Sequence, residues 1–316
     1  MCYKCAIYPN AIFAAMPQII HYSSCPACGS EQIKPVLQVK DFTVSKEIFA
    51  VWQCSQCTLR FTQDAPAPEA VGKYYLSPHY ISHTDTKQGI INQLYHAIRK
   101  FTLKKKRQLV QKESGLQKGS LLDVGAGTGA FANSMQEAGW NIMGLEPDET
   151  ARQNAVSKYK LNFQLPEALY KLEAQSFDVI TMWHVLEHVH DLHRYLQHCE
   201  RILKSGGTLI IAVPNYTSLD ANIYQEYWAA YDVPRHLYHF SPQSMESLLQ
   251  QHGFTITEYV PMLFDSFYIS MLSEQYKTGK SQLASAFISG LRSNMNALGN
   301  AAKYSSVIYV IKKSKR

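Results

Sequence analysis

Residues 121–129 read LLDVGAGTG, and this stretch decides the fold. Its first four residues form a short, mostly apolar run of the kind found in buried strands. Glycines follow, and glycine lets the backbone turn sharply and approach a ligand closely. A glycine-rich turn that leaves a strand and opens a helix is the context of a nucleotide-binding loop. The stretch therefore predicts a ligand site at the end of a strand in an α/β fold.

The glycine spacing and a downstream acid narrow the class of ligand. The glycines run G-x-G-x-G after Asp123, whereas the dinucleotide fingerprint is G-x-G-x-x-G. Glu146 ends the next predicted strand, where an acid in nucleotide-binding α/β folds accepts hydrogen bonds from both ribose hydroxyls. A structural turn beside a surface acid is the alternative, and the strand–turn–helix context argues against it.

Short apolar runs alternate with amphipathic stretches through the rest of the chain. This order predicts βαβ units and a mainly parallel, Rossmann-like sheet in an α/β fold. The predicted strands are Leu121–Val124, Ile142–Leu145, Phe177–Met182, Thr208–Val213, Thr255–Val260 and Val307–Ile311.

Residues 116–260 resemble a class I S-adenosylmethionine-dependent methyltransferase. The resemblance rests on LLDVGAGTG (121–129), GLEPDE (144–149), FDVITMWHVLEHV (177–189), RILKSGGTLIIAVPN (201–215) and the late Gly-Phe at 253–254. It implies methyl transfer from S-adenosylmethionine and a seven-stranded sheet whose last strand is antiparallel. It also implies donor contacts at Asp123, Gly125, Ala126, Gly127, Glu146, Pro147, Leu165, Glu167, Trp183 and His184.

Four N-terminal cysteines form two C-x-x-C pairs, at Cys25, Cys28, Cys54 and Cys57. Two such pairs supply the four thiolates that surround a tetrahedral zinc ion. An ion with four thiolate ligands has no open coordination position, so we expect it to stabilise the module rather than to catalyse. Buried structural cysteines or a redox pair are the alternatives, but two matched pairs favour a zinc ribbon.

The chain is expected to divide into four parts. These are a tail (1–20), a zinc-ribbon module (21–64), a helical linker (65–115) and the methyltransferase domain (116–316) with a substrate-side insert (214–240). In the linker, apolar spacing predicts a helix from Gly89 to Lys112. Six basic residues gather on it: Arg99, Lys100, Lys104, Lys105, Lys106 and Arg107. They form either a solvated helix face or a patch that attracts an anionic substrate, a nucleic acid or a membrane surface.

The insert is rich in aromatic and polar residues and follows the carboxyl end of a predicted strand, where α/β folds place ligands. We interpret Tyr227, Trp228, Arg235 and His239 as substrate-binding residues, with a packing hairpin as the alternative. Residues 235–241, RHLYHFS, resemble the segment E-H-L-x-Y-F-S of zinc-containing sugar-nucleotide C-methyltransferases, and also methyltransferases of cell-surface polysaccharide synthesis. That resemblance makes His236 the base. Arg235 stands where those enzymes have Glu, and it fits a phosphate-binding role.

Residues 184–188, HVLEH, match an inverted zinc-protease motif. The motif begins at the tip of a strand in a nucleotide-binding sheet, which is the wrong context for a protease. We expect Glu187 and His188 to face the substrate and to act with His236 in catalysis. A divalent ion held by His184, Glu187 and His188 is an alternative, because some quinone O-methyltransferases resemble this segment and use a metal there.

Composition sets the remaining expectations. The 316 residues carry a net charge of +6 and seven cysteines, an odd count that argues against a secreted disulfide framework. With no apolar run long enough to span a membrane and no signal-peptide pattern, we expect a cytoplasmic protein. The expected acceptor is a small molecule, first of all a nucleotide sugar or glycoconjugate. The alternatives are an RNA bound by the zinc ribbon, a quinone-type acceptor, and a non-catalytic binding module; a homodimer contact within residues 261–303 is also considered.

Overall fold

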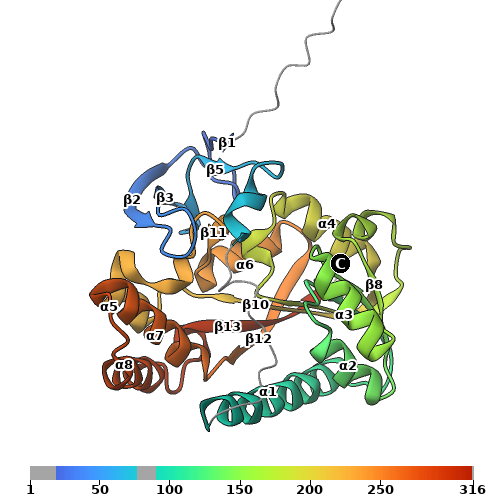
Figure 1. Ribbon diagram of the computed structural model, residues 1–316. Helices are drawn as coiled ribbons and strands as arrows, with labels where there is room; N and C mark the ends of the chain where they lie inside the picture. The colour runs from blue at the N-terminus through green and yellow to red at the C-terminus, as the bar shows by residue number, and fades with distance from the viewer. Residues whose placement is uncertain (1–18, 77–89, 315–316) are drawn as a thin grey trace, which may run out of the picture.

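The computed structural model describes residues 19–76 and 90–314, without the side chains of residues 90–97. Most of the predicted tail lies outside the described residues. The body of the molecule is a layered α/β domain, with the N-terminal strands and a cluster of helices against one end of it (Figure 1). No helix in the described part of the chain is long and apolar enough to cross a membrane.

A seven-stranded sheet forms the centre, in the order β12-β13-β10-β9-β6-β7-β8. Strand β13 is antiparallel to both neighbours, and the pairings among β8, β7, β6, β9 and β10 are parallel. This topology confirms the Rossmann-like fold and the antiparallel last strand. The strands are β6 (Ser120–Val124), β7 (Asn141–Leu145), β8 (Asn162–Gln164), β9 (Phe177–Trp183), β10 (Leu203–Pro214), β12 (Phe254–Pro261) and β13 (Ser306–Lys313).

Strand β8 has no counterpart among the six predicted strands. It is three residues long, Asn162–Gln164, and only its central Phe163 is apolar. A strand this short at the edge of a sheet shows no alternation that a pattern can reveal. The other six predictions are confirmed, with strand ends that differ by at most five residues because hydrogen bonding continues beyond the apolar run.

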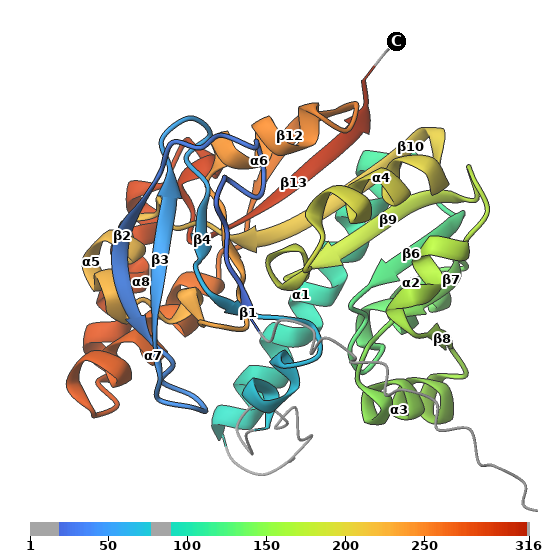
Figure 2. The ribbon, with the colours of Figure 1, turned by 90° about the horizontal axis from the view of Figure 1, so that it is seen from above.

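Helices cover both faces of this sheet (Figure 2). On one face, α4 and α6 pack their apolar residues into a core with β9 and β10. On the other face, α1, α2 and α3 pack against β6, β7 and β9. The helices are α1 (Ile90–Ser114), α2 (Ala130–Glu137), α3 (Glu149–Tyr159), α4 (Leu192–Ile202) and α6 (Pro242–Gln250).

Local sequence sets the helix ends. The side chains of Asp148 and Asp191 accept the amides of Ala151 and Arg194 and so cap α3 and α4. Ser241 caps α6 in a capping box, with Pro242 in the first turn. These caps fix where each helix leaves the sheet edge at which the ligand site lies.

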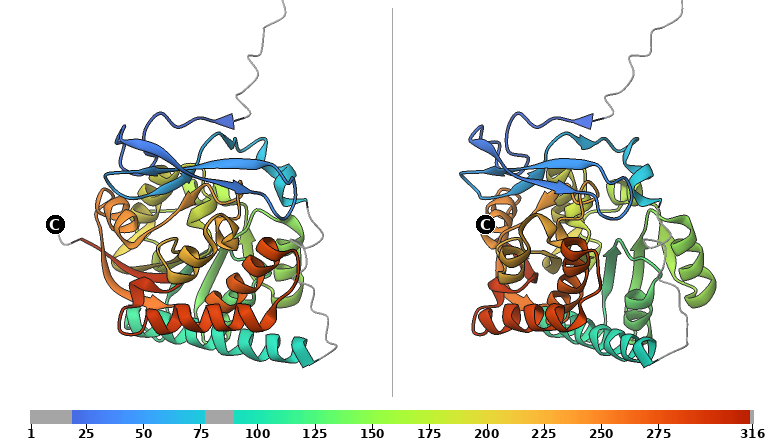
Figure 3. Two further views of the ribbon diagram at one scale, coloured as in Figure 1. Left: turned by 90° about the vertical axis from the view of Figure 1, so that its left-hand side faces the viewer. Right: turned by 60° about the vertical axis from the view of Figure 1, so that its left-hand side comes forward.

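The N-terminal module and the insert share one sheet, in the order β11-β4-β3-β2. Strand β11 (Tyr238–His239) belongs to the insert, whereas β4 (Arg60–Thr62), β3 (Ile48–Cys54) and β2 (Ile33–Lys40) belong to the module. Two short strands, β1 (Ile19–Ile20) and β5 (Ala65–Pro66), pair beside them, and the 3-10 helix η1 (Val71–Tyr75) follows. Figure 3 shows these strands as a layer above the helices of the insert. The module is therefore joined by main-chain hydrogen bonds to a segment far away in sequence.

The remaining helices lie in the insert and between β12 and β13. The insert contains α5 (Leu219–Tyr224), η4 (Gln225–Tyr227) and η5 (Ala229–Tyr231). Two helices, α7 (Asp265–Thr278) and α8 (Leu283–Asn296), form a hairpin that is followed by η6 (Ala301–Lys303). Along the main sheet, the short helices η2 (Pro166–Lys171) and η3 (Leu186–His188) follow β8 and β9.

Candidate active site

The glycine loop joins β6 to α2 and is tied to the end of β7. The amides of Gly125 and Ala126 donate to the carbonyl of Leu145 at 2.7 and 3.0 Å. Gly125 has a φ of +67°, and a Cβ there would lie 2.3 Å from Cγ2 of Val185. Residue 125 must therefore be glycine for conformational and steric reasons. The same contact places the segment after β9 directly against the loop.

Glu146 holds the other side of the loop. Its carboxylate is buried and accepts the amides of Gly127 at 2.7 Å and Asp148 at 3.0 Å. Burial raises the pKa of this carboxyl group. Because a carboxylate has about four acceptor positions, two stay available for the hydroxyls of a ribose. Pro147 follows at the edge of the site, where Arg152 donates to its carbonyl at 2.7 Å.

Asp123 lies at the carboxyl end of β6 and is buried. The hydroxyl of Thr181 donates to its Oδ1 at 2.7 Å. Burial raises the pKa of Asp123 to about 7, against the lowering effects of Thr181 and the Lys106 ammonium. Burial in turn lowers the pKa of Lys106 to about 8. A buried carboxylate at this position is a suitable partner for a ligand ammonium group.

Trp183 and His184 end β9. Phe131 lies edge-on to the Trp183 ring at 5.4 Å, and the Lys106 ammonium lies 4.1 Å from the ring centroid. The two ring nitrogens of His184 lie 3.3 Å from a Glu187 oxygen and 3.1 Å from an Asp265 oxygen. Burial alone would lower the pKa of His184, but the carboxylates of Asp265 and Glu187 outweigh it and raise the pKa to about 10. The two carboxylates therefore favour the protonated form of His184, and its Nε2 is bonded to Asp265.

Leu165 and Glu167 lie at the carboxyl end of β8, at the start of η2, and both are exposed. Their place at the same sheet edge as Glu146 agrees with the expected adenine side of the site. A contact with the donor at these two residues stays a prediction.

Glu187, His188 and His236 meet beside this sheet edge. One ligand atom of each residue lies within 4.8 Å of the others, and the two imidazole centroids are 4.6 Å apart. His188 and His236 each use Nδ1 on a backbone carbonyl, of Arg235 at 3.0 Å and of Ala230 at 2.8 Å. A carbonyl only accepts, so Nδ1 carries the proton in both rings and Nε2 is the basic nitrogen of each neutral imidazole.

Burial and neighbouring charges shift the pKa values of His188 and Glu187 for different reasons. Burial lowers the pKa of His188 to about 4, helped by His236, so His188 is neutral near pH 7. Burial would raise the pKa of Glu187, but the His184 cation outweighs it and lowers the pKa. Glu187 is fully buried, and neither of its oxygens has a hydrogen-bond partner of good geometry. The Glu187 carboxylate, the neutral imidazole of His188 and the imidazole of His236 form a group that can take a proton or bind a cation.

The predicted substrate residues are not gathered in the same place. Trp228 is buried and donates to Asp220 at 2.8 Å, and His239 is buried beside Tyr231 and Thr62. Tyr227 is half-buried next to Phe42, at 5.9 Å between rings. These contacts lie within the insert and with Phe42 and Thr62 of the module, and the substrate-binding role of the three residues stays a prediction.

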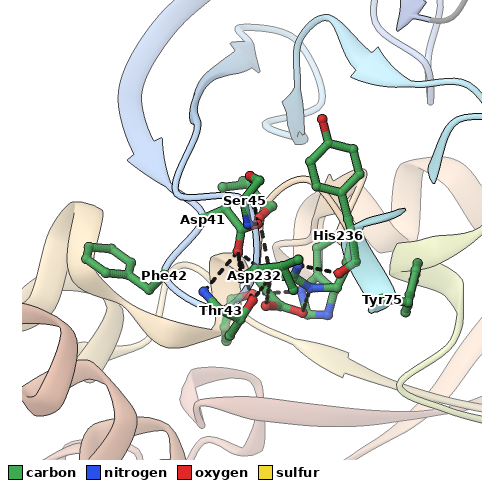
Figure 4. Close-up of polar contacts among 12 residues, drawn as sticks. Asp41, Phe42, Thr43, Ser45, Tyr75, Asp232 and His236 are labelled. Atoms are coloured by element: carbon green, nitrogen blue, oxygen red, sulfur yellow. Dashed lines mark hydrogen bonds and ion pairs between the residues drawn. The ribbon is translucent and has the colours of Figure 1, made fainter. Parts of the chain in front are cut away.

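Arg235 is 1% exposed and is fully engaged inside the protein. Its guanidinium donates to Asp41 at 2.9 Å, to Asp232 at 2.7 and 3.0 Å, and to the carbonyl of Tyr74 at 2.8 Å (Figure 4). It also contacts the Thr43 hydroxyl. These contacts give Arg235 a structural role, and its predicted phosphate-binding role stays a prediction.

Sequence patterns missed three residues of the site. The Tyr75 hydroxyl lies 3.1 Å from His188 Nδ1, and Asp265 pairs with His184 from the start of α7. Asp41, the partner of Arg235, lies in the loop after β2. Only Tyr75 carried a signal, as part of an aromatic cluster between the predicted domains. The two aspartates are isolated acids, and only folding brings them to their partners.

The four cysteine thiols converge in the N-terminal module. All lie within 4.8 Å of one another, with Cys25–Cys57 and Cys28–Cys54 sulfur distances of 3.5 and 3.6 Å. These separations are too long for disulfides. Gly29 and Thr58, which follow the two knuckles, both have a positive φ, so the two turns share one geometry. Four converging thiols on paired knuckles fit a tetrahedral zinc ion.

A family model described as a methyltransferase domain matches residues 95–259, which is more than half of the chain. The chain belongs to this methyltransferase family. Together with the glycine loop, Glu146 and the strand order, the match makes the protein an S-adenosylmethionine-dependent methyltransferase.

Similar proteins are known by sequence and by structure. The human mitochondrial ubiquinone biosynthesis O-methyltransferase is 29% identical over 46% of this methyltransferase and 44% of its own length. The ubiquinone biosynthesis O-methyltransferase of Actinobacillus pleuropneumoniae is 34% identical over 34% of this chain and 50% of its own length. The chain thus spans half or less of these relatives. A solved possible histamine N-methyltransferase from Thermotoga maritima covers 72% of this chain and 96% of its own, with 22% identity and a TM-score of 0.48.

Proposed function

We propose that this methyltransferase O-methylates a small-molecule acceptor at the cluster of Glu187, His188 and His236. The observation that carries the proposal is the pair of imidazoles beside a buried carboxylate, next to the segment that packs on the donor loop. A hydroxyl group needs only alignment and a base to attack a methyl group that is already activated by a sulfonium charge.

Each of these residues has one role in the proposed reaction. When bound, S-adenosylmethionine supplies an electrophilic methyl group. Asp123 and Glu146 hold the two polar ends of the donor, and His236 Nε2 takes the hydroxyl proton as the acceptor oxygen attacks in line. The Ala230 carbonyl fixes the tautomer of His236. Glu187 then stabilises the imidazolium that forms, because the two groups lie within 4.8 Å.

A divalent ion is a second route to the same activation. Glu187, His188 and His236 offer one carboxylate and two imidazole nitrogens, a donor set that divalent metals accept. The ion would lower the pKa of a bound hydroxyl group. The sequence placed His184 in this ligand set, but in the structure its Nε2 is bonded to Asp265, and His236 lies in the cluster with Glu187 and His188.

The first acceptor class that we propose is a hydroxylated ring of the quinone type. The relatives named for ubiquinone biosynthesis support it, and so does the engagement of Arg235, which removes the cation expected to hold a nucleotide phosphate. A nucleotide sugar or glycoconjugate is the second class, supported by the likeness of residues 235–241 to sugar C-methyltransferases. RNA is the third class, supported by the paired-cysteine module and by the basic residues of helix α1.

The first experiment is calorimetric titration with S-adenosylhomocysteine, comparing wild type with Glu146→Ala. We expect binding that the substitution abolishes. Transfer of labelled methyl groups is then measured with polyhydroxylated aromatic compounds, nucleotide sugars and RNA. His236→Gln should lower turnover by about 100-fold or more while S-adenosylhomocysteine still binds. His252→Gln, a half-buried histidine that pairs with His193 away from the cluster, is the matched control.

The outcomes separate the alternatives. Full turnover in His236→Gln would refute the proposal that His236 is the base. Turnover that is lost on chelation and restored by a divalent ion would assign the cluster to metal activation. A labelled product only from nucleotide sugars or only from RNA would replace the acceptor class.

A further inference from the structure

Helix α8 turns its large apolar side chains to solvent. Its inner face consists of small residues, namely Ala286, Ser289, Gly290, Ser293 and, just after it, Ala297. Its outer face carries Leu283, Phe287, Leu291 and Met295, which are 61%, 58%, 42% and 60% exposed. A surface helix normally buries its large apolar residues and exposes polar ones. Helix α8 has the reverse pattern.

The packing fixes this orientation. A Cβ on Gly290 would lie 2.8 Å from the ring of Phe267 on α7, so the two helices need a glycine at this crossing. The Ser293 hydroxyl donates to Asp220 of α5 at 2.6 Å. Rotating α8 to bury Phe287 would place large side chains where only small ones fit and would break the bond to Asp220. The exposed stripe is therefore built into the fold.

The stripe continues onto the neighbouring elements as an apolar face. Phe264 and Tyr268 at the start of α7 are exposed, as are Ile288 and Leu298 on and after α8. The Phe264 ring meets Phe101 of α1 edge-on at 6.0 Å. Figures 1 and 3 place α8 and α1 along the same edge of the molecule, away from the N-terminal strands. An exposed apolar patch of this extent marks an interaction surface.

Along the described parts of α1, α7 and α8, the exposed charged side chains are all basic. Exposed basic side chains lie on α1, around the α7–α8 turn, on α8 and after it: Lys100, Lys104, Lys105, Lys277, Lys280, Arg292 and Lys303. In residues 98–112 and 262–303, which the structure describes, no acidic side chain is exposed. Asp265 pairs with His184, and Glu274 is buried against Tyr224 and Ser285. A large apolar stripe with basic side chains around it complements an anionic lipid surface.

We propose that this face of the methyltransferase binds anionic membrane surfaces. The stripe of Leu283, Phe287, Leu291 and Met295 enters the boundary between headgroups and acyl chains, and the basic side chains meet the lipid phosphates. A second copy of the chain is disfavoured on the same face, because two surfaces of equal positive charge would be brought together. The inference is independent of the acceptor, since it rests on α1, α7 and α8 and not on the histidine cluster.

Vesicle co-sedimentation of the full chain tests the proposal. Wild type should sediment with vesicles that contain phosphatidylglycerol and stay in solution with vesicles of phosphatidylcholine alone, and added salt should weaken the binding. Phe287→Gln/Leu291→Gln and Lys280→Glu/Arg292→Glu should each lower partitioning by about tenfold or more. Ile48→Gln, which replaces a 66% exposed residue on β3, is the matched control and should not change it.

Binding of S-adenosylhomocysteine and the melting temperature report whether each variant is folded. Failure of wild type to bind anionic vesicles, or equal binding by folded α8 variants, would overturn the proposal. Light scattering measures the oligomeric state and so tests whether a second copy of the chain binds this face. A wild-type dimer that Phe287→Gln/Leu291→Gln converts to a monomer would assign the face to that second copy. Loss of turnover without loss of vesicle binding would bear on the proposed reaction alone.

Discussion

Single residues in the donor site are fixed by contacts that a sequence motif does not contain. The motif explains why glycines follow Asp123, but the 2.3 Å approach of Val185 explains why position 125 in particular accepts no side chain. In the same way, Glu146 appears in the sequence as a ribose-binding acid, and the structure adds that it holds the amide of Gly127.

Substituting Gly125→Ala should reduce the affinity for S-adenosylhomocysteine by about tenfold or more, because the methyl group collides with Val185 and alanine disfavours a positive φ. Calorimetric titration measures the loss. Gly72→Ala, where the added Cβ meets nothing within 4 Å, is the control. Adding Val185→Ala should restore part of the affinity. An unchanged affinity in Gly125→Ala would show that the loop does not form the donor site.

Donor binding should depend on pH through Asp123. Burial raises the pKa of this carboxyl group to about 7, so it is largely protonated below that pH and must lose a proton to pair with the donor ammonium. Affinity for S-adenosylhomocysteine should thus be constant well above pH 7 and fall by up to about tenfold per pH unit well below it. Asp123→Asn should bind weakly with a flat profile across this range. A sloping profile in that variant would assign the titration to another group.

At the scale of elements, the cysteine knuckles and the insert are coupled by a strand pairing. Strand β4 follows the second knuckle and pairs with β11, and β11 begins two residues after His236. The Thr62 amide and hydroxyl also bond to the carbonyls of Leu237 and His236 at 2.9 and 2.7 Å. A change in the metal-binding module can therefore reach the proposed base through the main chain.

Removal of zinc should lower both stability and turnover. Metal analysis should find one zinc per chain in wild type, and a chelator or Cys28→Ser should lower the melting temperature by about 10 °C, because binding of a structural ion contributes to folding. Turnover should also fall when zinc is lost, because the β4–β11 pairing connects the cysteine module to the segment that carries His236. Cys199→Ser removes a buried thiol of α4 that lies outside the cluster, so its response to the chelator should match wild type. Zinc-free protein with an unchanged melting temperature would contradict this role.

At the scale of the whole molecule, a buried ion-pair network joins the module, the linker and the insert. Arg235 and Asp232 come from the insert, Asp41 from the loop after β2, and the Tyr74 carbonyl from η1. Arg235 and Asp41 are almost completely buried. This network lies beside His236, so it also helps to position the cluster (Figure 4).

Replacing Arg235→Leu should destabilise the protein by about 3–5 kcal/mol, because Asp41 would stay buried without its counter-ion. Urea unfolding of the metal-loaded protein measures this loss. Arg201→Leu, at a partly exposed arginine on α4, should cost far less. A stable Arg235→Leu variant that lost only acceptor binding would instead restore the substrate role that the sequence suggested.

The sequence by itself determined the donor half of this protein. The glycine loop, Glu146, the strand runs and the paired cysteines are local patterns, and each depends on residues that lie close together along the chain. For the proposed acceptor half, the sequence suggested Glu187, His188 and His236, but only the tertiary structure decided how they meet. His236 lies beside Glu187 and His188 across 49 and 48 positions of sequence, Asp265 reaches His184 from α7, and Arg235 is buried among its acidic partners. Such pairings arise because folding brings distant segments to one sheet edge, where burial and neighbouring charges set what each side chain does.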